Sequence, residues 1–343
     1  MVKLAQFIAR RIALLIPVLL GILLLSFTLS RVVPADPARF AAGRHATPEM
    51  VQALRHKFAL DRPLPEQFVR YVGSIVQGDL GRSLVTRRPV VEDIRRFYPA
   101  TLELVLVAVA IAVVIGIPAG VISCRFENRW PDHLSRLFAF GLISVPEFWL
   151  ALLIQLLAAG FLGVLPISGR FDPNVAPPAT ITGLLLVDSV LRLDWSGFLI
   201  ALKHIVLPAA ALSAPALATI TRMSRAGMVE AMRKDFVLTA RASGLPELII
   251  LSRHALRHAL IPVLSMIGLS VTWSMAGSVL VETIFSWPGL GHYIVEASLL
   301  LDYEPIMGTM LVLGATVGVT NIIIDMLYAI VDPRIREGFA GPA

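Results

Sequence analysis

The chain has 343 residues, of which 56% are hydrophobic and only 16% are charged, and its formal net charge is +6. Its mean hydropathy of +0.77 exceeds that of soluble domains, so the composition indicates an all-α membrane protein with about six spans of roughly 20 residues each. The single cysteine, Cys124, excludes an internal disulfide framework, and the basic excess is typical of cytoplasmic loops rather than of a nucleic-acid-binding protein.

The first apolar run extends from Ile12 to Leu29 and follows three basic residues. A signal peptide also starts with a basic segment, but this run is longer than its usual hydrophobic region and no small-residue cleavage site follows. Residues 1–31 are therefore predicted to form a cytoplasmic N-terminus and a retained first span. Residues 32–99 are predicted to form a long extracytoplasmic segment.

Two parts of that outer segment carry local signals. In "TPEMVQALRHKFAL", Thr47 can cap a short helix whose apolar residues have helical spacing. Further on, "RRPVVEDI" is interpreted as turns and a short surface helix before the second span. The basic residues here do not contradict an outer position, because long loops cross the membrane largely regardless of their charge.

Residues 100–330 are predicted to form a core of five further spans, and residues 331–343 a cytoplasmic tail. The third span is interrupted near Pro146, and the outer loop after it contains a small amphipathic element around residues 184–193. The five spans are expected at about 101–123, 137–164, 205–223, 260–284 and 306–330.

The distribution of charge supports this layout. Residues 222–258, expected inside, contain seven Lys/Arg and three acidic residues, whereas residues 286–304, expected outside, contain no Lys/Arg and three acidic residues. This asymmetry satisfies the positive-inside rule for six spans with both termini in the cytoplasm.

Catalytic motifs are absent from the sequence. No glycine is followed by lysine, so the chain has no phosphate-binding P-loop and is not expected to hydrolyse ATP. HExxH and GxSxG patterns are also missing. His254 and His258 share a helix face, but no third ligand is near them in sequence, so we expect an ordinary polar helix and no metal site.

Polar residues inside the spans are candidates for function, because each is costly in lipid. Glu103, Glu147, Glu282, Asn321 and Asp325 lie in or at the ends of predicted spans. They either line a hydrated substrate path, for which Glu147, Asn321 and Asp325 are our candidates, or hold helices together. The small-residue patterns "GIPAG" (116–120) and "GATVG" (314–318) favour close helix packing.

A basic segment, "TARASGLPELIILSRHALRH" (239–258), lies between two apolar runs. Gly244 and Pro246 interrupt its helical pattern, which predicts helix, turn and helix. Ala240 and Ala242 leave a low surface that a soluble partner can approach, and Arg241 adds charge. An ordinary basic inner loop is the alternative interpretation.

The longer segment "DFVLTARASGLPELIILSRHALRHALIPVL" resembles the cytoplasmic coupling loop of permease subunits in bacterial ATP-binding-cassette (ABC) importers of the dipeptide/oligopeptide/nickel family. "LDRPLPEQFVRYVGSIVQGDLGRS", "PATLEL", "LPISGR", "VETIFSWPGLG" and "YAIVDPRIR" resemble the same family, so the resemblance covers nearly the whole chain. The N-terminal span and long outer loop are similar to the first of the two permeases in such systems. The general loop motif begins Glu-Ala-Ala and has a glycine four positions after the second alanine. In this chain only that alanine (Ala240) and the glycine (Gly244) match the motif.

The resemblance implies a type I ABC importer permease fold with six transmembrane helices in the bacterial inner membrane. It implies that a coupling loop at about 225–258 inserts a short helix into an ATPase subunit. The residues implied in this contact are Thr239, Ala240, Arg241, Ala242, Gly244 and Leu245. The implied partners are a second, related permease in a heterodimer, two ATPase subunits that bind ATP and Mg²⁺, an extracytoplasmic binding protein and membrane lipid. The chain itself is expected to bind no cofactor.

The function implied by the resemblance is a translocation path for dipeptides or oligopeptides. Nickel chelates and glutathione are alternative substrates of the same importer class. A proton-coupled secondary transporter would instead use the membrane carboxylates as a relay and need no ATPase. An intramembrane enzyme would need a catalytic constellation, which the sequence does not contain.

Overall fold

The computed structural model describes residues 2–32, 47–57 and 61–331. Most of the predicted tail, 332–343, and residues 33–46 of the outer segment lie outside this range. The described residues form helices joined by turns and loops, with one isolated β-bridge. The helices are α1 (Val2–Val32), α3 (Pro48–Lys57), α4 (Leu64–Val76), α5 (Val90–Arg125), α6 (Trp130–Ser144), α7 (Glu147–Ile154), α8 (Leu185–Leu191), α9 (Trp195–Met232), α10 (Asp235–Ala242), α11 (Glu247–Ile249), α12 (Leu256–Ile284), α13 (Leu290–Leu299) and α14 (Tyr303–Val331), with π-helical turns at Gln155–Phe161 and Ile250–Ala255.

Among the described residues, five helical segments are long and apolar enough to cross a membrane: Ala9–Thr28, Val90–Arg125, Trp195–Met232, Glu247–Ile284 and Tyr303–Leu327. A sixth span results if the bent pair Trp130–Ser144 and Glu147–Ala158 counts as one. The two helices of this pair meet at an angle of 103°. The predicted interruption near Pro146 is therefore confirmed, because Pro146 immediately precedes α7 and has no backbone N–H to continue the preceding helix.

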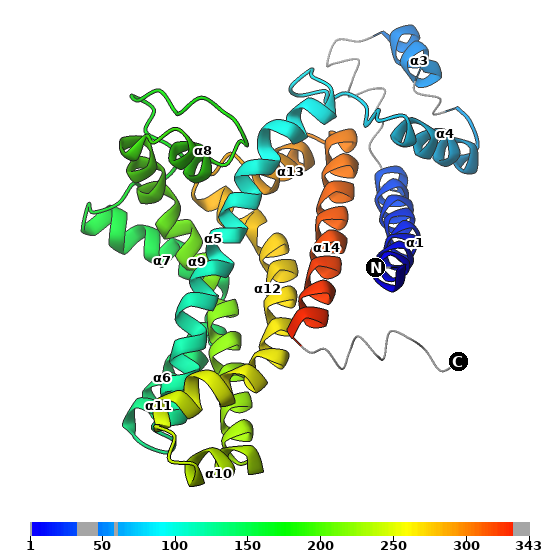
Figure 1. The fold of residues 1–343 in the computed structure, drawn as a ribbon. Helices are drawn as coiled ribbons and strands as arrows, with labels where there is room; N and C mark the ends of the chain where they lie inside the picture. Colours follow the sequence, from blue (N-terminus) through cyan, green and yellow to red (C-terminus); the bar gives the residue numbers. More distant parts are fainter. Residues whose placement is uncertain (1, 33–46, 58–60, 332–343) are drawn as a thin grey trace.

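The three long helices α5, α9 and α12 form the centre of the molecule (Figure 1). Their facing sides bury apolar residues, among them Ala108, Leu212 and Met275. Helices α6 and α7 pack against α9, and α14 packs against α12. Because lipid is as apolar as these side chains, close contact between helices stabilises such a bundle more than exclusion from water does.

Glycines permit the closest helix contacts, as the small-residue patterns predict. A Cβ added at Gly116 of α5 would lie 3.0 Å from the Ile220 side chain of α9, and one added at Gly120 would meet the α9 backbone at 2.8 Å. Gly314 and Gly318 of α14 have side chains of α1 directly against them. The prediction that "GIPAG" and "GATVG" favour close packing is confirmed.

The interpretation of "RRPVVEDI" as turns and a separate surface helix is wrong in its second part. Val90 begins α5 itself, and both Val90 and Asp93 are buried. The Asp93 carboxylate accepts hydrogen bonds from the Thr86 hydroxyl at 2.5 Å and from the Tyr293 hydroxyl at 3.0 Å. These donors, together with an ion pair from Arg88 Nη2 to Asp93 Oδ1 at 2.7 Å, allow a charged residue to lie inside the structure, where sequence pattern alone places it on the surface.

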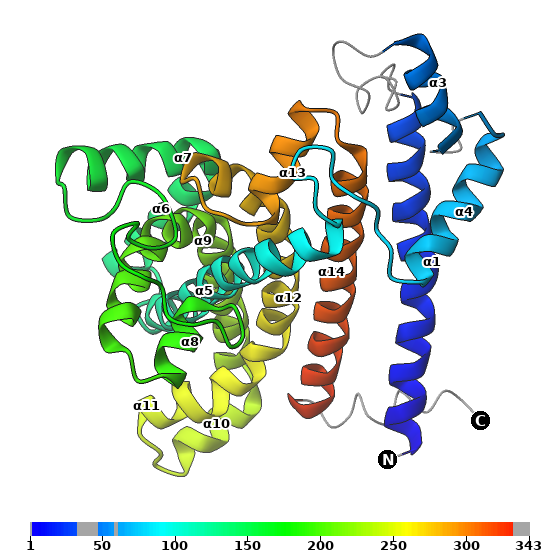
Figure 2. The same cartoon turned by 90° about the horizontal axis from the view of Figure 1, so that it is seen from above.

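The two ends of the bundle carry different short elements (Figure 1). Helices α10 and α11 lie at one end, and α8 and α13 lie toward the other. The predicted amphipathic element at 184–193 corresponds to α8, and the predicted Thr47 cap is present, with Thr47 Oγ1 accepting a hydrogen bond from the Met50 amide at 3.4 Å. Helix α1 lies beside α14 at the edge of the molecule (Figure 2).

Candidate functional site

The loop formed by α10, the turn at 243–246 and α11 is the helix–turn–helix predicted from the sequence; we call it the α10–α11 loop. Gly244 has a φ of +76°, in the left-handed region that glycine adopts without strain. The Leu245 amide donates to the Ala240 carbonyl at 3.2 Å and the Gly244 amide to the Arg241 carbonyl at 2.9 Å, which closes the end of α10. An added Cβ would meet no atom of the described chain within 4 Å. The backbone conformation, and not crowding within this chain, is therefore what favours glycine at this position.

An ion pair links the two helices of this loop. Arg241 Nη2 donates to Glu247 Oε1 at 2.7 Å, and Arg241 Nε donates to Glu247 Oε2 at 3.2 Å. The contact with the carboxylate raises the pKa of the Arg241 guanidinium above its usual value. Both side chains remain about half exposed to solvent, so the pair can orient the loop and still be reached by a partner.

Apolar side chains project from the same loop. Leu238 and Leu248 are 61% and 64% exposed, and Leu245 and Ile249 are also exposed. Ala240, by contrast, is buried against Val237 and Ile250, so it packs the loop onto its own base. Of the six residues predicted for partner contact, Thr239, Arg241, Ala242, Gly244 and Leu245 are exposed and Ala240 is not.

The two histidines that follow this loop do not form a metal cluster with a third ligand. The His258 ring stacks on Phe236 with a centroid distance of 4.6 Å. Within the described part of the chain, no three His, Cys, Asp or Glu side chains are grouped as metal ligands.

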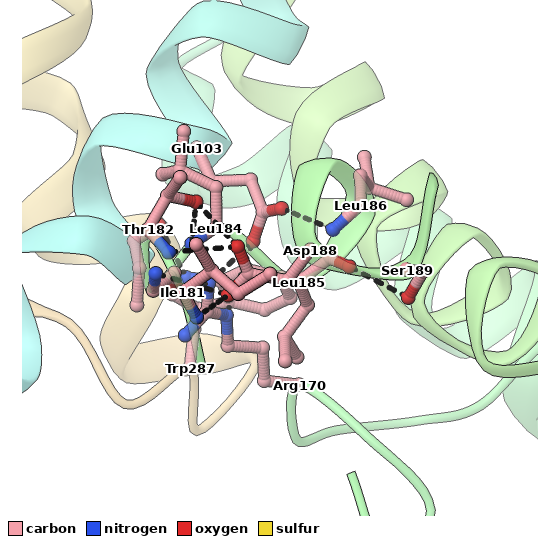
Figure 3. Close-up of polar contacts among 12 residues, drawn as sticks. Glu103, Arg170, Ile181, Thr182, Leu184, Leu185, Leu186, Asp188, Ser189 and Trp287 are labelled. Carbon is pink, nitrogen blue, oxygen red and sulfur yellow. Dashed lines mark hydrogen bonds and ion pairs between the residues drawn. The ribbon is translucent and has the colours of Figure 1, made fainter. Parts of the chain in front are cut away.

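At the opposite end of the bundle, Glu103 of α5 is bound by a basic residue from the loop that precedes α8 (Figure 3). Arg170 Nη2 donates to Glu103 Oε2 at 2.5 Å and to the Gly183 carbonyl at 2.7 Å, and the Leu186 amide donates to Glu103 Oε1 at 2.7 Å. The carboxylate is 4% exposed and the guanidinium 14%. This arrangement is a largely buried ion pair that ties the loop before α8 to α5.

Asp188 of α8 organises the turn beside this pair (Figure 3). Its carboxylate accepts hydrogen bonds from the amides of Ile181, Thr182 and Gly183 and from the Thr182 hydroxyl, at 2.6–3.1 Å. Burial opposes ionisation of Asp188, but these hydrogen bonds together outweigh it and hold its pKa below the usual range. The turn is therefore built around an ionised carboxylate.

A third set of polar contacts ties α5 to the end of α12 and to the segment that follows it. Glu282 accepts a hydrogen bond from the Thr101 hydroxyl at 2.7 Å, and the Trp287 indole N–H donates to the Ala100 carbonyl at 2.9 Å. Sequence reasoning identified Glu103 and Glu282 but did not identify Arg170 and Asp188, because both lie in the segment predicted as a loop, where a charged residue needs no explanation. Both acids act here in helix and loop packing.

The predicted path residues do not lie together. Glu147 lines a pocket of about 300 Å³ between α9 and α12, and neither Asn321 nor Asp325 lines it. Asp325 of α14 forms an ion pair with Arg11 of α1 at 2.8 Å, and Asn321 is exposed on α14. Of the three candidates, Glu147 is the one that lines this pocket.

Membrane helices around a pocket, with a helical loop projecting at one end, are the parts of a membrane transport subunit. The family described as "Binding-protein-dependent transport system inner membrane component" matches residues 112–337, and its N-terminal family matches residues 4–105. The chain belongs to this family, and it is a permease subunit of an ABC importer.

Several relatives are similar over nearly their full length. The chain is 42% identical to a probable D,D-dipeptide transport system permease protein of Escherichia coli strain K12, covering 94% of this chain and 95% of the relative. It is 42% identical to a di/tripeptide transport system permease protein of Pseudomonas aeruginosa strain UCBPP-PA14, covering 97% and 99%. It is also 35% identical to a glutathione transport system permease protein of Pectobacterium atrosepticum, covering 96% and 99%.

The fold has a counterpart among solved structures. An inward-facing conformation of the MetNI methionine ABC transporter matches with a TM-score of 0.50 at 18% identity, over 68% of this chain and 93% of the other. The expected type I importer permease fold is confirmed.

Proposed function

We propose that this permease forms half of a translocation path for dipeptides and other short peptides. The observation that carries the proposal is the similarity to dipeptide permeases, which extends over nearly the whole chain at 37–42% identity. The path would be completed by a second, related permease in a heterodimer. An extracytoplasmic binding protein would deliver the substrate.

The α10–α11 loop would couple this path to two ATPase subunits. Its exposed Leu238 and Leu248 can enter an apolar cleft of a partner, and the Arg241–Glu247 pair can hold α10 at a fixed angle. ATP and Mg²⁺ would bind to the ATPases, because this chain contains no P-loop. A coupling element of this kind must make different contacts in the two states of the transporter.

The orientation follows from the charge asymmetry of the sequence. We place both termini and the α10–α11 loop in the cytoplasm, and residues 32–99 and the Arg170 loop outside, in a bacterial inner membrane. The Arg11–Asp325 pair supports a helix-packing role for Asp325, because it joins α1 to α14. Glu147 is therefore our candidate for a residue of the path.

The same experiment tests the alternative functions. Glutathione is an alternative substrate because one relative is a glutathione permease, and nickel chelates are another alternative substrate of the same importer class. A proton-coupled secondary transporter would work without any ATPase.

The test is uptake of a labelled panel containing dipeptides, a tripeptide, glutathione and a nickel chelate. A strain from which the gene has been deleted is compared with the same strain carrying the restored chain. We expect restoration of dipeptide uptake and its loss when the ATPases are inactivated. Restored uptake of glutathione or nickel alone would replace peptides by that substrate, and uptake without ATPases would favour the secondary transporter.

A further inference from the structure

The pocket between α9 and α12 contains one ionisable side chain. Glu147 enters it from the first turn of α7, directly after the break at Pro146. None of the residues that line the pocket is basic. Its volume of about 300 Å³ lies at the lower end of the range for small-molecule sites, about 300–1,000 Å³.

The Glu147 carboxylate reaches α12 because Gly277 leaves room for it. A Cβ added at Gly277 would lie 2.6 Å from Glu147 Oε2. Glu147 Oε1 is buried and has no hydrogen-bond partner within the described part of the chain. A buried carboxylate oxygen without a donor is costly, so a missing donor is expected from outside this chain.

The neighbouring hydroxyls are also arranged to accept. Thr219 Oγ1 donates its proton to the Pro215 carbonyl at 2.8 Å, and Ser270 Oγ donates to the Met266 carbonyl at 2.7 Å. Each oxygen therefore retains lone pairs for a donor in the pocket. The indole ring of Trp273, which also lines the pocket, adds an aromatic surface of the kind that attracts cations.

We propose that this pocket is a binding subsite for the primary ammonium group of the transported molecule, with Glu147 as its counter-charge and Trp273, Thr219 and Ser270 around it. The inference rests on the proposed function, since a free peptide carries such a group at its N-terminus. A discontinuous helix beside a cavity is a common way to expose a charged group to substrate inside a membrane.

The experiment uses the complete transporter, with both permeases and the ATPases, purified in lipid nanodiscs without the binding protein. Equilibrium binding of radiolabelled Ala-Ala is compared with that of N-acetyl-Ala-Ala, which lacks the ammonium group. We expect the wild type to bind Ala-Ala more tightly. Glu147→Gln should weaken binding of Ala-Ala by about tenfold, the value of one charged hydrogen bond, and leave binding of the acetylated peptide unchanged.

Two further variants keep the test independent of folding defects. Thr219→Val keeps the side-chain shape and removes one acceptor, and it should reduce the preference for Ala-Ala by a smaller factor. Glu296→Gln makes the same chemical change at an exposed residue of α13 that does not line the pocket, and it should behave as wild type.

The inference is overturned if the wild type does not prefer the free amine, or if Glu147→Gln affects both peptides equally. It is also overturned if Glu147→Gln lowers recovery of the second permease instead, because the pocket would then be a subunit contact. In each of these cases uptake of Ala-Ala by wild-type cells keeps the proposed function intact. Absence of any peptide uptake would remove the proposed function and this subsite together.

Discussion

Arg241 and Glu247 face each other across the Gly244 turn and form two hydrogen bonds, at 2.7 and 3.2 Å. The pair fixes the angle between α10 and the helical segment leading to α12. Because α12 continues from this segment into the bundle, the proposed coupling role requires that a movement of α10 be passed to a membrane helix through this short, braced turn.

Gly244 is the first position to test. Its φ of +76° is adopted without strain by glycine and with little strain by asparagine, whereas other residues are strained there. Gly244→Leu should leave membrane insertion intact and reduce substrate uptake severely, whereas Gly244→Asn should keep most of it. Uptake and co-purification of the ATPases are measured, with Ser252→Ala as the control. If Gly244→Asn fails as completely as Gly244→Leu, close approach of a partner is the constraint; if both transport normally, the loop has no coupling role.

The Arg241–Glu247 pair can be tested by exchanging its charges. Arg241→Glu places two carboxylates together and should reduce ATPase co-purification and uptake. If the pair acts by bracing the turn, the double variant Arg241→Glu/Glu247→Arg should restore both. The effect on overall stability should be small, about 1 kcal/mol or less, because both side chains are about half exposed. Failure of the double variant to restore coupling would show that Arg241 contacts the ATPase directly.

Arg170 should be important for stability rather than for coupling. Arg170→Ala leaves Glu103 buried without its counter-charge, and removing one partner of a buried ion pair costs about 3–5 kcal/mol. We expect a lower midpoint of thermal unfolding in nanodiscs for Arg170→Ala and a smaller decrease for Arg170→Lys, which keeps the charge but not the planar contact. An exposed arginine, Arg233→Ala, is the control. Equal midpoints for all of these proteins would show that the loop before α8 is not held by this pair.

The stability of the folded protein should depend on pH through the Asp188 carboxylate. Its pKa is lower in the folded protein than the ordinary value of 3.8, so its hydrogen bonds contribute fully above that value. The contribution is lost as pH falls through the lower, folded pKa. The unfolding midpoint of Asp188→Asn should therefore lie below that of wild type at neutral pH, and the difference should shrink below about pH 4. A difference that stays constant down to the lowest pH would mean that the charge of Asp188 does not stabilise the turn.

The parts of this structure that could be predicted from sequence are those set by local chemistry. Hydrophobic length identified the spans, Pro146 the break in the third, and Gly244 with Pro246 the turn between α10 and α11. Contacts between distant segments could not be predicted in this way. Arg170 lies 67 residues from Glu103, and nothing in the periodicity of either segment indicates that they meet.

The same limit explains why sequence could not decide which of the predicted path residues lie together. Asn321 and Asp325 are spaced to share a helix face, which is all that sequence can state, and the position of α1 then decides that Asp325 pairs with Arg11. Asp93 is a similar case, because one of its hydrogen-bond donors, Tyr293, lies 200 residues further along the chain. A polar residue in a span is identified by its cost in lipid, but its role depends on which helix lies beside it.

The α10–α11 loop should face the cytoplasm and the loop before α8 the opposite side of the membrane. Cysteine labelling can test this orientation because the chain has a single native cysteine, which is buried. In a Cys124→Ala background, single cysteines are introduced at Ser168, Arg129 and Ser243, all exposed in the described structure. A membrane-impermeant maleimide added to intact cells with a permeable outer envelope should label Ser168→Cys only. Arg129→Cys and Ser243→Cys should react after the inner membrane is opened, because the basic segments that contain them are expected inside. Labelling of Ser243→Cys from outside would reverse the topology and place the α10–α11 loop where no cytoplasmic ATPase can reach it.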